Sequence, residues 1–153
     1  MSERADRGPL KLPRTRRWTV YGVSFLTWIT GVLWLIFHYF MATEGRFGPE
    51  THPLEPWWKV LHAGVSFFAV GILGLLWGVH ILRGWNANWR RWSGGILAGF
   101  FFVLTLTGYA LYYIYMINED WKGTTSIIHW VLGLVSIAAF FFHWLSKSKS
   151  KGA

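Results

Sequence analysis

The sequence predicts an all-α membrane protein in which four transmembrane helices form one bundle. Only 14% of the residues are charged, whereas a soluble domain carries about 25%. Four long apolar runs, at about 18–41, 57–82, 92–117 and 124–145, each reach the ~20 residues that cross a bilayer. The runs are continuous rather than alternating, so we expect helices and not the strands of a membrane barrel.

Basic residues are concentrated in the segments that we expect on one side of the membrane. Twelve of the fifteen Lys and Arg residues lie in residues 1–17, in the loop 83–91 or in the tail 146–153. Cytoplasmic segments carry the excess of Lys and Arg, so both termini are expected in the cytoplasm. The net charge of +8 then indicates topology and contact with anionic lipid, not nucleic-acid binding.

We expect a single membrane domain, residues 18–145, between a flexible cytoplasmic segment 1–17 and a basic cytoplasmic tail 146–153. The first apolar run is too long for a signal peptide and has no convincing cleavage site, so it is expected to be retained. The chain has no cysteine. This excludes disulfides, thiol catalysis, iron–sulfur ligation and covalent haem attachment within the chain.

Two of the four predicted helices carry one histidine near each end. His129 and His143 are fourteen residues apart, which places them ~21 Å apart along a helix and within ~40° on its wheel. His62 and His80 are eighteen residues apart, about five full turns. Ionisable residues inside a membrane are functional candidates. We therefore expect His62 to pair with His129 near the outer surface. His80 should pair with His143 near the inner surface.

Two histidine pairs at separate levels favour haem over other metal sites. Zinc or copper needs three or four ligands that converge on one point, and pairs ~20 Å apart cannot supply them. Haem brings four nitrogens of its own and needs two axial ligands. The sequence thus predicts two non-covalent b haems per chain.

The four-residue excess between His62 and His80 leaves an alternative open. Tilt, a bend at Gly71 or Gly74, or unequal haem heights could absorb it. Alternatively, His38 is the outer partner of His129, and His62 lies beside the haem or near a quinone. His52 is expected at the surface.

A weak internal repeat relates the first two helices to the last two. The motif Thr27–Gly31 resembles Thr105–Gly108, and His62 and His129 then open the next helices. The two helix pairs are expected to be parallel repeats about an axis along the membrane normal. Small residues four and seven positions after each of these histidines share its face and leave room for a porphyrin: Ser66, Ala69, Gly133 and Ser136.

Haem propionates are anionic and need basic or hydrogen-bonding partners near the membrane surfaces. The expected partners are Arg83 and Arg90 on the inner side and Lys59 on the outer side. Arg91 is expected to contribute to topology alone.

The pattern resembles the small bacterial membrane cytochromes b. These include the cytochrome b561 family and the b-type subunits of formate dehydrogenases, hydrogenases and thiosulfate reductases. The resemblance covers residues 18–145 and is carried by the following residues: His62 with His80, His129 with His143-Trp144, Thr30-Gly31 and Thr107-Gly108. It implies a four-helix bundle in a bacterial inner membrane, with two b haems, that passes electrons between quinone and a partner protein. The dehydrogenase subunits take a ligand from the first helix, whereas here the inner half of that run has no histidine.

The expected function is that of a di-haem b-type cytochrome in a respiratory complex, moving electrons across the membrane. Quinone would be one exchange partner, and an extracytoplasmic redox protein at loop 42–56 the other: a multihaem cytochrome c, a flavoprotein or an iron–sulfur subunit. Oxidation of quinol or reduction of quinone would be its only chemistry, since the sequence contains no other catalytic constellation. A homodimer is left open. The alternatives are a haem-free anchor subunit, or a small proton-coupled transporter, which would need carboxylates at depth.

Overall fold

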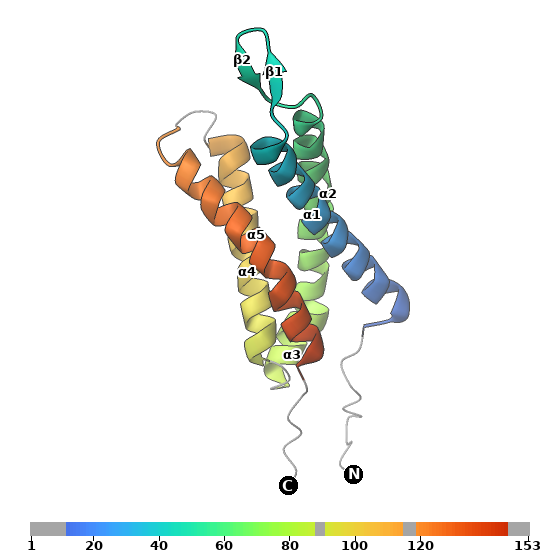
Figure 1. The fold of residues 1–153 in the computed structure, drawn as a ribbon. Coiled ribbons are helices and arrows are strands. Elements are labelled where there is room, and N and C mark those ends of the chain that lie inside the picture. The colour runs from blue at the N-terminus through green and yellow to red at the C-terminus, as the bar shows by residue number, and fades with distance from the viewer. Residues whose placement is uncertain (1–11, 88–90, 115–118, 147–153) are drawn as a thin grey trace, which may run out of the picture.

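The computed structural model describes residues 12–87, 91–114 and 119–146 and is mostly helical (Figure 1). Four helical segments in these ranges are long and apolar enough to cross a membrane, so the expected number of spans is confirmed. They are α1 (Arg14–Phe40); α2 (Glu55–Leu76), which continues through η1 (Trp77–Ile81) and α3 (Leu82–Asn86); α4 (Arg91–Tyr109), which continues through η2 (Ala110–Ile114); and α5 (Lys122–Leu145).

The helices pack as two antiparallel pairs. The helix α1 packs along α2, and α4 packs along α5, whereas contacts between the pairs are fewer and occur mainly where α1 approaches α5 and α3 approaches α4. The described chain begins and ends at one end of the bundle, which we call the terminal end (Figure 1). The opposite end, which carries the two strands, is called the hairpin end.

A short β-hairpin follows α1, where the sequence predicted only a loop. The strand β1 (Thr43–Gly45) pairs with β2 (Gly48–Glu50) in antiparallel register, with Thr43 opposite Glu50 and Gly45 opposite Gly48. Gly48 has a φ of 124°, which favours glycine at this position. The tip residue Phe47 is 93% exposed.

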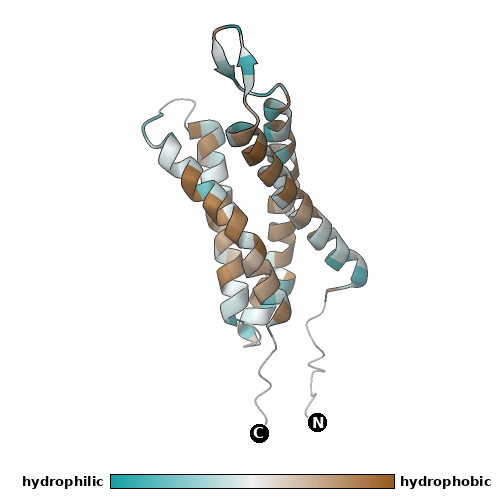
Figure 2. Cartoon of the chain, viewed as in Figure 1, coloured by the Kyte–Doolittle hydropathy of each residue, from teal (hydrophilic) through white to brown (hydrophobic). Residues whose placement is uncertain are grey.

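The interior of the bundle has no buried apolar core. None of the described apolar side chains is buried, whereas Thr30 and Ser93 are each only 4% exposed. Many large apolar side chains of the helices are exposed instead, and Figure 2 shows that hydrophobic residues predominate along the middle of the helices. This outer surface suits hydrocarbon, and helices in lipid associate through small residues and hydrogen bonds rather than through hydrophobic burial.

The continuous helix from α2 to α3 contains a π-helical segment, η1, which includes His80. A π turn has i→i+5 hydrogen bonds and so accommodates extra residues within one turn. Gly71 and Gly74, the predicted bend positions, lie within α2, which is regular through both. The departure from regular α-helix between His62 and His80 therefore lies at η1 and not at the predicted glycines.

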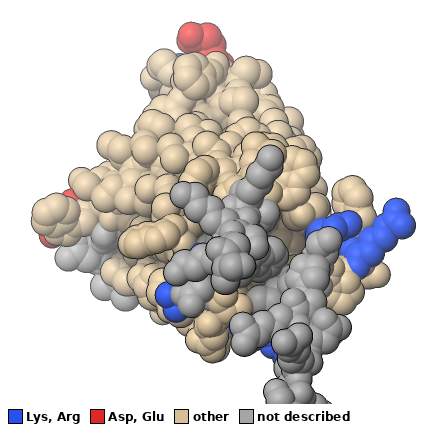
Figure 3. Space-filling view, turned by 90° about the horizontal axis from the view of Figure 1, so that it is seen from below, with Lys and Arg blue, Asp and Glu red and all other residues tan. Residues whose placement is uncertain are grey.

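Charges separate between the two ends of the bundle. Arginines gather at the terminal end, seen from below in Figure 3. They belong to the starts of α1 and α4 and to α3: Arg14, Arg16, Arg17, Arg83 and Arg91. The carboxylates of the described residues belong to segments at the hairpin end: Glu44, Glu50, Glu55, Glu119 and Asp120. One of them, Glu119, accepts a hydrogen bond from Lys122 Nζ at 2.8 Å, which holds the pKa of this carboxyl below its usual value.

Glu55 joins the end of α1 to the start of α2. Its Oε1 accepts a hydrogen bond from Trp34 Nε1 at 2.8 Å and lies 3.2 Å from His38 Nδ1. His38 also stacks on Trp34, with ring centroids 4.8 Å apart. The Glu55 side chain is only 12% exposed, so these contacts are well shielded.

We expect Glu55→Ala to destabilise the bundle because it leaves the Trp34 indole and His38 without their shared acceptor. Hydrogen bonds to a charged group contribute about 2 kcal/mol, which corresponds to a Tm lower by about 4–8 °C. Thermal unfolding in detergent micelles measures the shift. Glu44→Ala on the exposed strand β1 is the control and should leave Tm unchanged; equal shifts in both variants would contradict this role.

Candidate functional site

Two histidine pairs bridge the two helix pairs. His62 on α2 faces His129 on α5, with ring centroids 6.3 Å apart and ring planes at 81°. His80 in η1 faces His143 on α5, again at 6.3 Å and with planes at 90°. The structure thus brings together the four histidines in the two pairs that the sequence predicts.

The separation of the rings matches two imidazoles that share one metal ion. When each ring binds the ion through a nitrogen at about 2.0 Å from opposite sides, the ring centroids lie about 6 Å apart. A direct N–H···N bond of about 2.9 Å would bring the rings roughly 1 Å closer. Both pairs have the spacing of the bridged geometry.

The described residues contain no group of three or more His, Cys, Asp and Glu side chains that could hold a metal ion. A site made by the protein alone, such as a zinc site, needs at least three such ligands. Two facing imidazoles suffice only where the metal carries most of its ligands with it, as haem iron does.

His62 is seated against α1 by a hydroxyl and a glycine. Its Nδ1 lies 3.2 Å from Thr30 Oγ1 and 3.0 Å from the carbonyl oxygen of Thr27. A Cβ at Gly31 would come within 3.0 Å of His62 Cε1. Glycine at this position therefore leaves the space that the imidazole occupies beside α1.

The same arrangement holds His129 against α4. Its Nδ1 lies 2.8 Å from Thr107 Oγ1, and a Cβ at Gly108 would lie 3.3 Å from its Cε1. The sequence had indicated Thr30-Gly31 and Thr107-Gly108 as parts of a weak repeat and of the resemblance to b-type cytochromes, and the structure places both pairs against the histidine rings.

A third hydroxyl–glycine pair, Ser93-Gly94, was missed in the sequence. Ser93 Oγ lies 3.1 Å from His143 Nδ1, and a Cβ at Gly94 would lie 3.5 Å from His143 Cε1. The signal was present as a Ser-Gly dipeptide fourteen residues before Thr107-Gly108. That spacing equals the spacing of His129 and His143.

The hydrogen-bond pattern fixes the proton of these imidazoles on Nδ1. Thr30 Oγ1 donates its own proton to the Leu26 carbonyl at 2.7 Å, and Thr107 Oγ1 donates to the Val103 carbonyl at 2.8 Å. Each hydroxyl oxygen can therefore only accept from the histidine.

His143 has a comparable position. Its Nδ1 lies 3.1 Å from Ser93 Oγ, which also lies 3.0 Å from Ser146 Oγ, and Ser146 Oγ donates to the His143 carbonyl at 3.0 Å. With the protons of His62 and His129 on Nδ1, their Nε2 lone pairs are available for a metal ion, which is the arrangement that orients metal-binding histidines.

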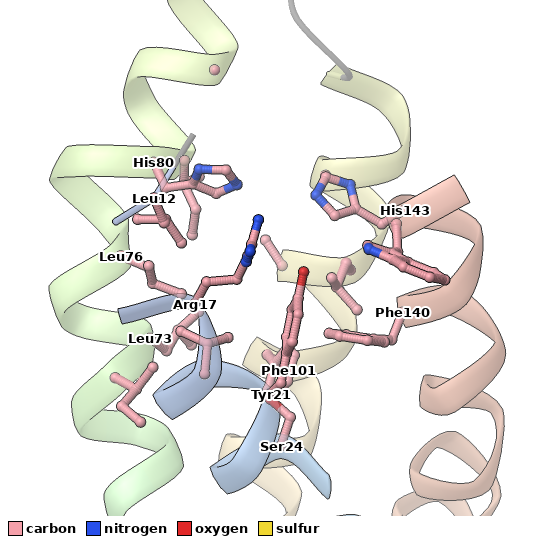
Figure 4. A pocket seen from close by; sticks show the side chains of 18 of the residues that line it. Leu12, Arg17, Tyr21, Ser24, Leu73, Leu76, His80, Phe101, Phe140 and His143 are labelled. Atoms are coloured by element: carbon pink, nitrogen blue, oxygen red, sulfur yellow. The ribbon is translucent and has the colours of Figure 1, made fainter. Parts of the chain in front are cut away.

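A cavity of about 380 Å³ lies beside the second pair of histidines at the terminal end. His80 and His143 both line it, and Figure 4 shows their imidazoles on its two sides. Small residues make the room, since the lining includes Ala69, Gly84, Gly94, Gly95 and Ala98. The volume is within the range of pockets for small molecules and cofactors, about 300–1,000 Å³.

Of the four small residues predicted to face a porphyrin, Ala69 lines this cavity. Ser66, Gly133 and Ser136 are half-buried. A Cβ at Gly133 would meet nothing within 4 Å, so there is open space beside it. Ser136 Oγ donates to the Gly133 carbonyl at 2.7 Å, which satisfies its hydroxyl within α5.

Arg83, predicted on the inner side, is exposed and does not line the cavity, and Arg90 lies outside the described residues. Lys59, predicted on the outer side, is exposed on α2. Among the described residues, the arginines that line the cavity are Arg17 and Arg91.

The other two histidines have different contacts. His38 is bonded to Glu55 and stacked on Trp34, while the position opposite His129 is taken by His62. His52 packs edge-on against Phe37, and its Nδ1 accepts a hydrogen bond from the Leu54 amide at 3.1 Å. The structure therefore places neither of them beside a histidine pair.

Comparisons with known proteins identify no relative of this chain. No protein-family model matches the chain, and no curated protein and no solved structure matches it. The resemblance to b-type cytochromes stays a prediction, and the function must be inferred from the geometry of this chain.

We expect Gly108→Val to push the His129 imidazole out of its position, because even a Cβ there lies 3.3 Å from the ring. Changes to groups that orient metal ligands cost about 10–100-fold in affinity. Haem titration followed by visible absorbance measures this loss. Gly99→Val on the same helix is the matched control, because a Cβ at Gly99 meets nothing within 4 Å. Equal affinities in the two variants would contradict the steric role of Gly108.

Proposed function

We propose that the chain is a di-haem b-type cytochrome that moves electrons across a bacterial inner membrane. The observation that carries the proposal is the geometry of the two histidine pairs. Both have ring centroids 6.3 Å apart, and in three of the four rings Nδ1 lies within hydrogen-bonding distance of a group on a neighbouring helix. Imidazoles arranged in this way are ready to bind a metal ion between them.

In this proposal His62 and His129 hold one haem toward the hairpin end. His80 and His143 hold the other toward the terminal end. Each haem, when bound, supplies an iron that takes up and releases one electron. The chain fixes the axial ligands, orients them through Thr30, Thr107 and Ser93, and surrounds the site with apolar side chains. These are the features by which a protein sets a haem potential.

The interior of the bundle supports the same proposal. Four long helices have no buried apolar side chain among the described residues, yet small residues line a cavity beside a histidine pair. Protein interiors are normally close-packed. A rigid, flat, apolar cofactor bound between the helix pairs would provide the packing that the side chains do not.

We place both termini in the cytoplasm and treat the helix pairs as parallel repeats. The arginines at the terminal end support the orientation through the positive-inside rule. The equivalent positions of Thr30-Gly31 with His62 and of Thr107-Gly108 with His129 support the repeat. In this orientation the hairpin end faces the extracytoplasmic side.

The hairpin end offers a docking surface for a redox partner in the membrane complex. It presents the aromatic side chains Phe47 and Trp57, 93% and 71% exposed, near the carboxylates Glu44 and Glu50. Exposed aromatic residues are enriched in protein interfaces. Electrons would pass between this surface and a quinone, over two levels separated by ~21 Å along α5.

The ligand assignment predicts which haem each histidine variant loses. His62→Ala and His143→Ala should each bind one haem where the parent chain binds two, because each variant removes one axial ligand. Haem b is quantified per chain from reduced-minus-oxidised spectra of purified protein. His38→Ala is the control and should retain two haems, since His38 contacts Glu55 instead.

Three outcomes would overturn parts of this proposal. Two haems in His62→Ala, together with one in His38→Ala, would make His38 the ligand. A single haem in the parent chain would leave one pair structural. A parent chain free of haem, from cells supplied with it, would leave the anchor and transporter functions.

A further inference from the structure

The helix α1 contributes polar side chains to the lining of the cavity beside His80 and His143. Arg17 and Tyr21 both line the cavity, and Figure 4 shows their side chains extending from α1 into it, with the Arg17 guanidinium directed toward the space between the two imidazoles. The two residues are four positions apart, so they share one face of the first turns of α1. Tyr21 is fixed against α5 by an edge-on contact with Phe140, at 5.6 Å between centroids.

The cavity has positive charge and no matching negative charge in its described lining. Two arginines and two histidines line it, with no carboxylate. Arg91 is already engaged, since its Nε donates to the Trp85 carbonyl at 2.7 Å and its guanidinium lies 5.3 Å from the Trp85 ring. Arg17 belongs to neither of the two ion pairs that the described residues form.

Sequence register independently places Arg17 at the level of this histidine pair. Gly94, which seats His143, lies fourteen residues before Gly108, which seats His129. Arg17 lies fourteen residues before Gly31, which seats His62. A long cationic side chain thus occupies on α1 the register position that glycine occupies on α4.

Arg17 is exposed overall and also lines the cavity, so its guanidinium is available to an anion bound in this space. Arginine binds carboxylates through two parallel N–H···O bonds, and a phenol hydroxyl can donate a third hydrogen bond. We propose that Arg17, together with Tyr21, binds a propionate carboxylate of the haem held by His80 and His143. This assignment rests on the proposed function and replaces the expectation that Arg83 and Arg90 fill that role.

The test is a redox titration of the intact membrane protein that compares Arg17→Gln with Arg16→Gln. His62→Ala as the background leaves only the haem of His80 and His143, so its potential is measured alone. Removing a positive charge beside the haem favours the oxidised iron. We expect Arg17→Gln to shift the equilibrium about tenfold toward oxidation, a midpoint potential lower by about 59 mV for one electron.

Arg16→Gln removes the same charge from the same helix, but Arg16 does not line the cavity, so the potential should stay at its parent value. Arg17→Lys keeps the charge and should recover most of the shift. If Arg17→Gln fails to accumulate, Tyr21→Phe provides the test, because it removes a hydrogen-bond donor without a change in charge. A changed potential in that variant supports the assignment.

Several outcomes would overturn the assignment without touching the proposed function. These are a bound haem whose potential is the same in Arg17→Gln as in the parent, or equal shifts in Arg16→Gln and Arg17→Gln. An unchanged potential in Tyr21→Phe, where that variant provides the test, is another. An unchanged potential combined with lost binding of a quinone analogue would assign Arg17 to a quinone instead. Failure of the proposed function is distinct, since the parent protein would then contain no haem to titrate.

Discussion

The hydrogen bond from a histidine Nδ1 to a hydroxyl on the neighbouring helix is the interaction on which the candidate site depends. It does three things at once. It fixes the proton on Nδ1, it leaves Nε2 unprotonated, and it holds α1 to α2 and α4 to α5 at the level of the ring. The adjacent glycine is part of the same constraint, because a Cβ at Gly31 or Gly108 would press on the imidazole. A hydroxyl residue followed by glycine therefore positions a histidine of the neighbouring helix. The hydroxyl accepts the hydrogen bond, and the glycine leaves the space for the ring.

This constraint explains how the bundle can lack an apolar core. In a membrane, burial of apolar side chains does not drive helices together, so packing and interhelical hydrogen bonds must do so. The Thr30, Thr107 and Ser93 contacts act within the helix pairs, whereas the facing imidazoles lie between the pairs. The structure thus consists of two helix pairs, α1 with α2 and α4 with α5, that contact each other less than the helices do within each pair. Under the proposed function, the stability of the whole bundle depends on cofactor binding, because a ligand that binds only the folded state stabilises it by mass action.

The spans, their approximate ends and the pairing of the four histidines could be predicted because each depends on local composition or on helical periodicity. The β-hairpin could not, since residues 42–56 have turn-forming residues but only two three-residue strands. The contact of Ser93 with His143 could not be predicted either. A single Ser-Gly dipeptide does not indicate a histidine contact, and only the structure shows that Ser93 Oγ lies 3.1 Å from His143 Nδ1. The role proposed for Arg17 could not be predicted either, because Arg17 lies in a run of arginines at a membrane boundary. The positive-inside rule accounts for each arginine in this run, and Arg17 differs from its neighbours in lining the cavity.

The two levels of the proposed repeat differ, and the differences occur together. At the hairpin end both histidines have a Thr-Gly seat, on α1 and on α4. At the terminal end only His143 has the corresponding Ser-Gly seat, while α1 has Arg16-Arg17 in that register. The opposite ligand is displaced four residues further along its helix than in the α5 spacing and lies in a π turn. An arginine side chain needs the space that a seated imidazole would fill, so moving His80 by about one turn leaves room for it. Under the proposed assignment, the longer histidine spacing on α2 and the charged side chain on α1 have one physical explanation: an arginine that binds an anion lies at the terminal end in the register position that a hydroxyl–glycine pair occupies at the hairpin end.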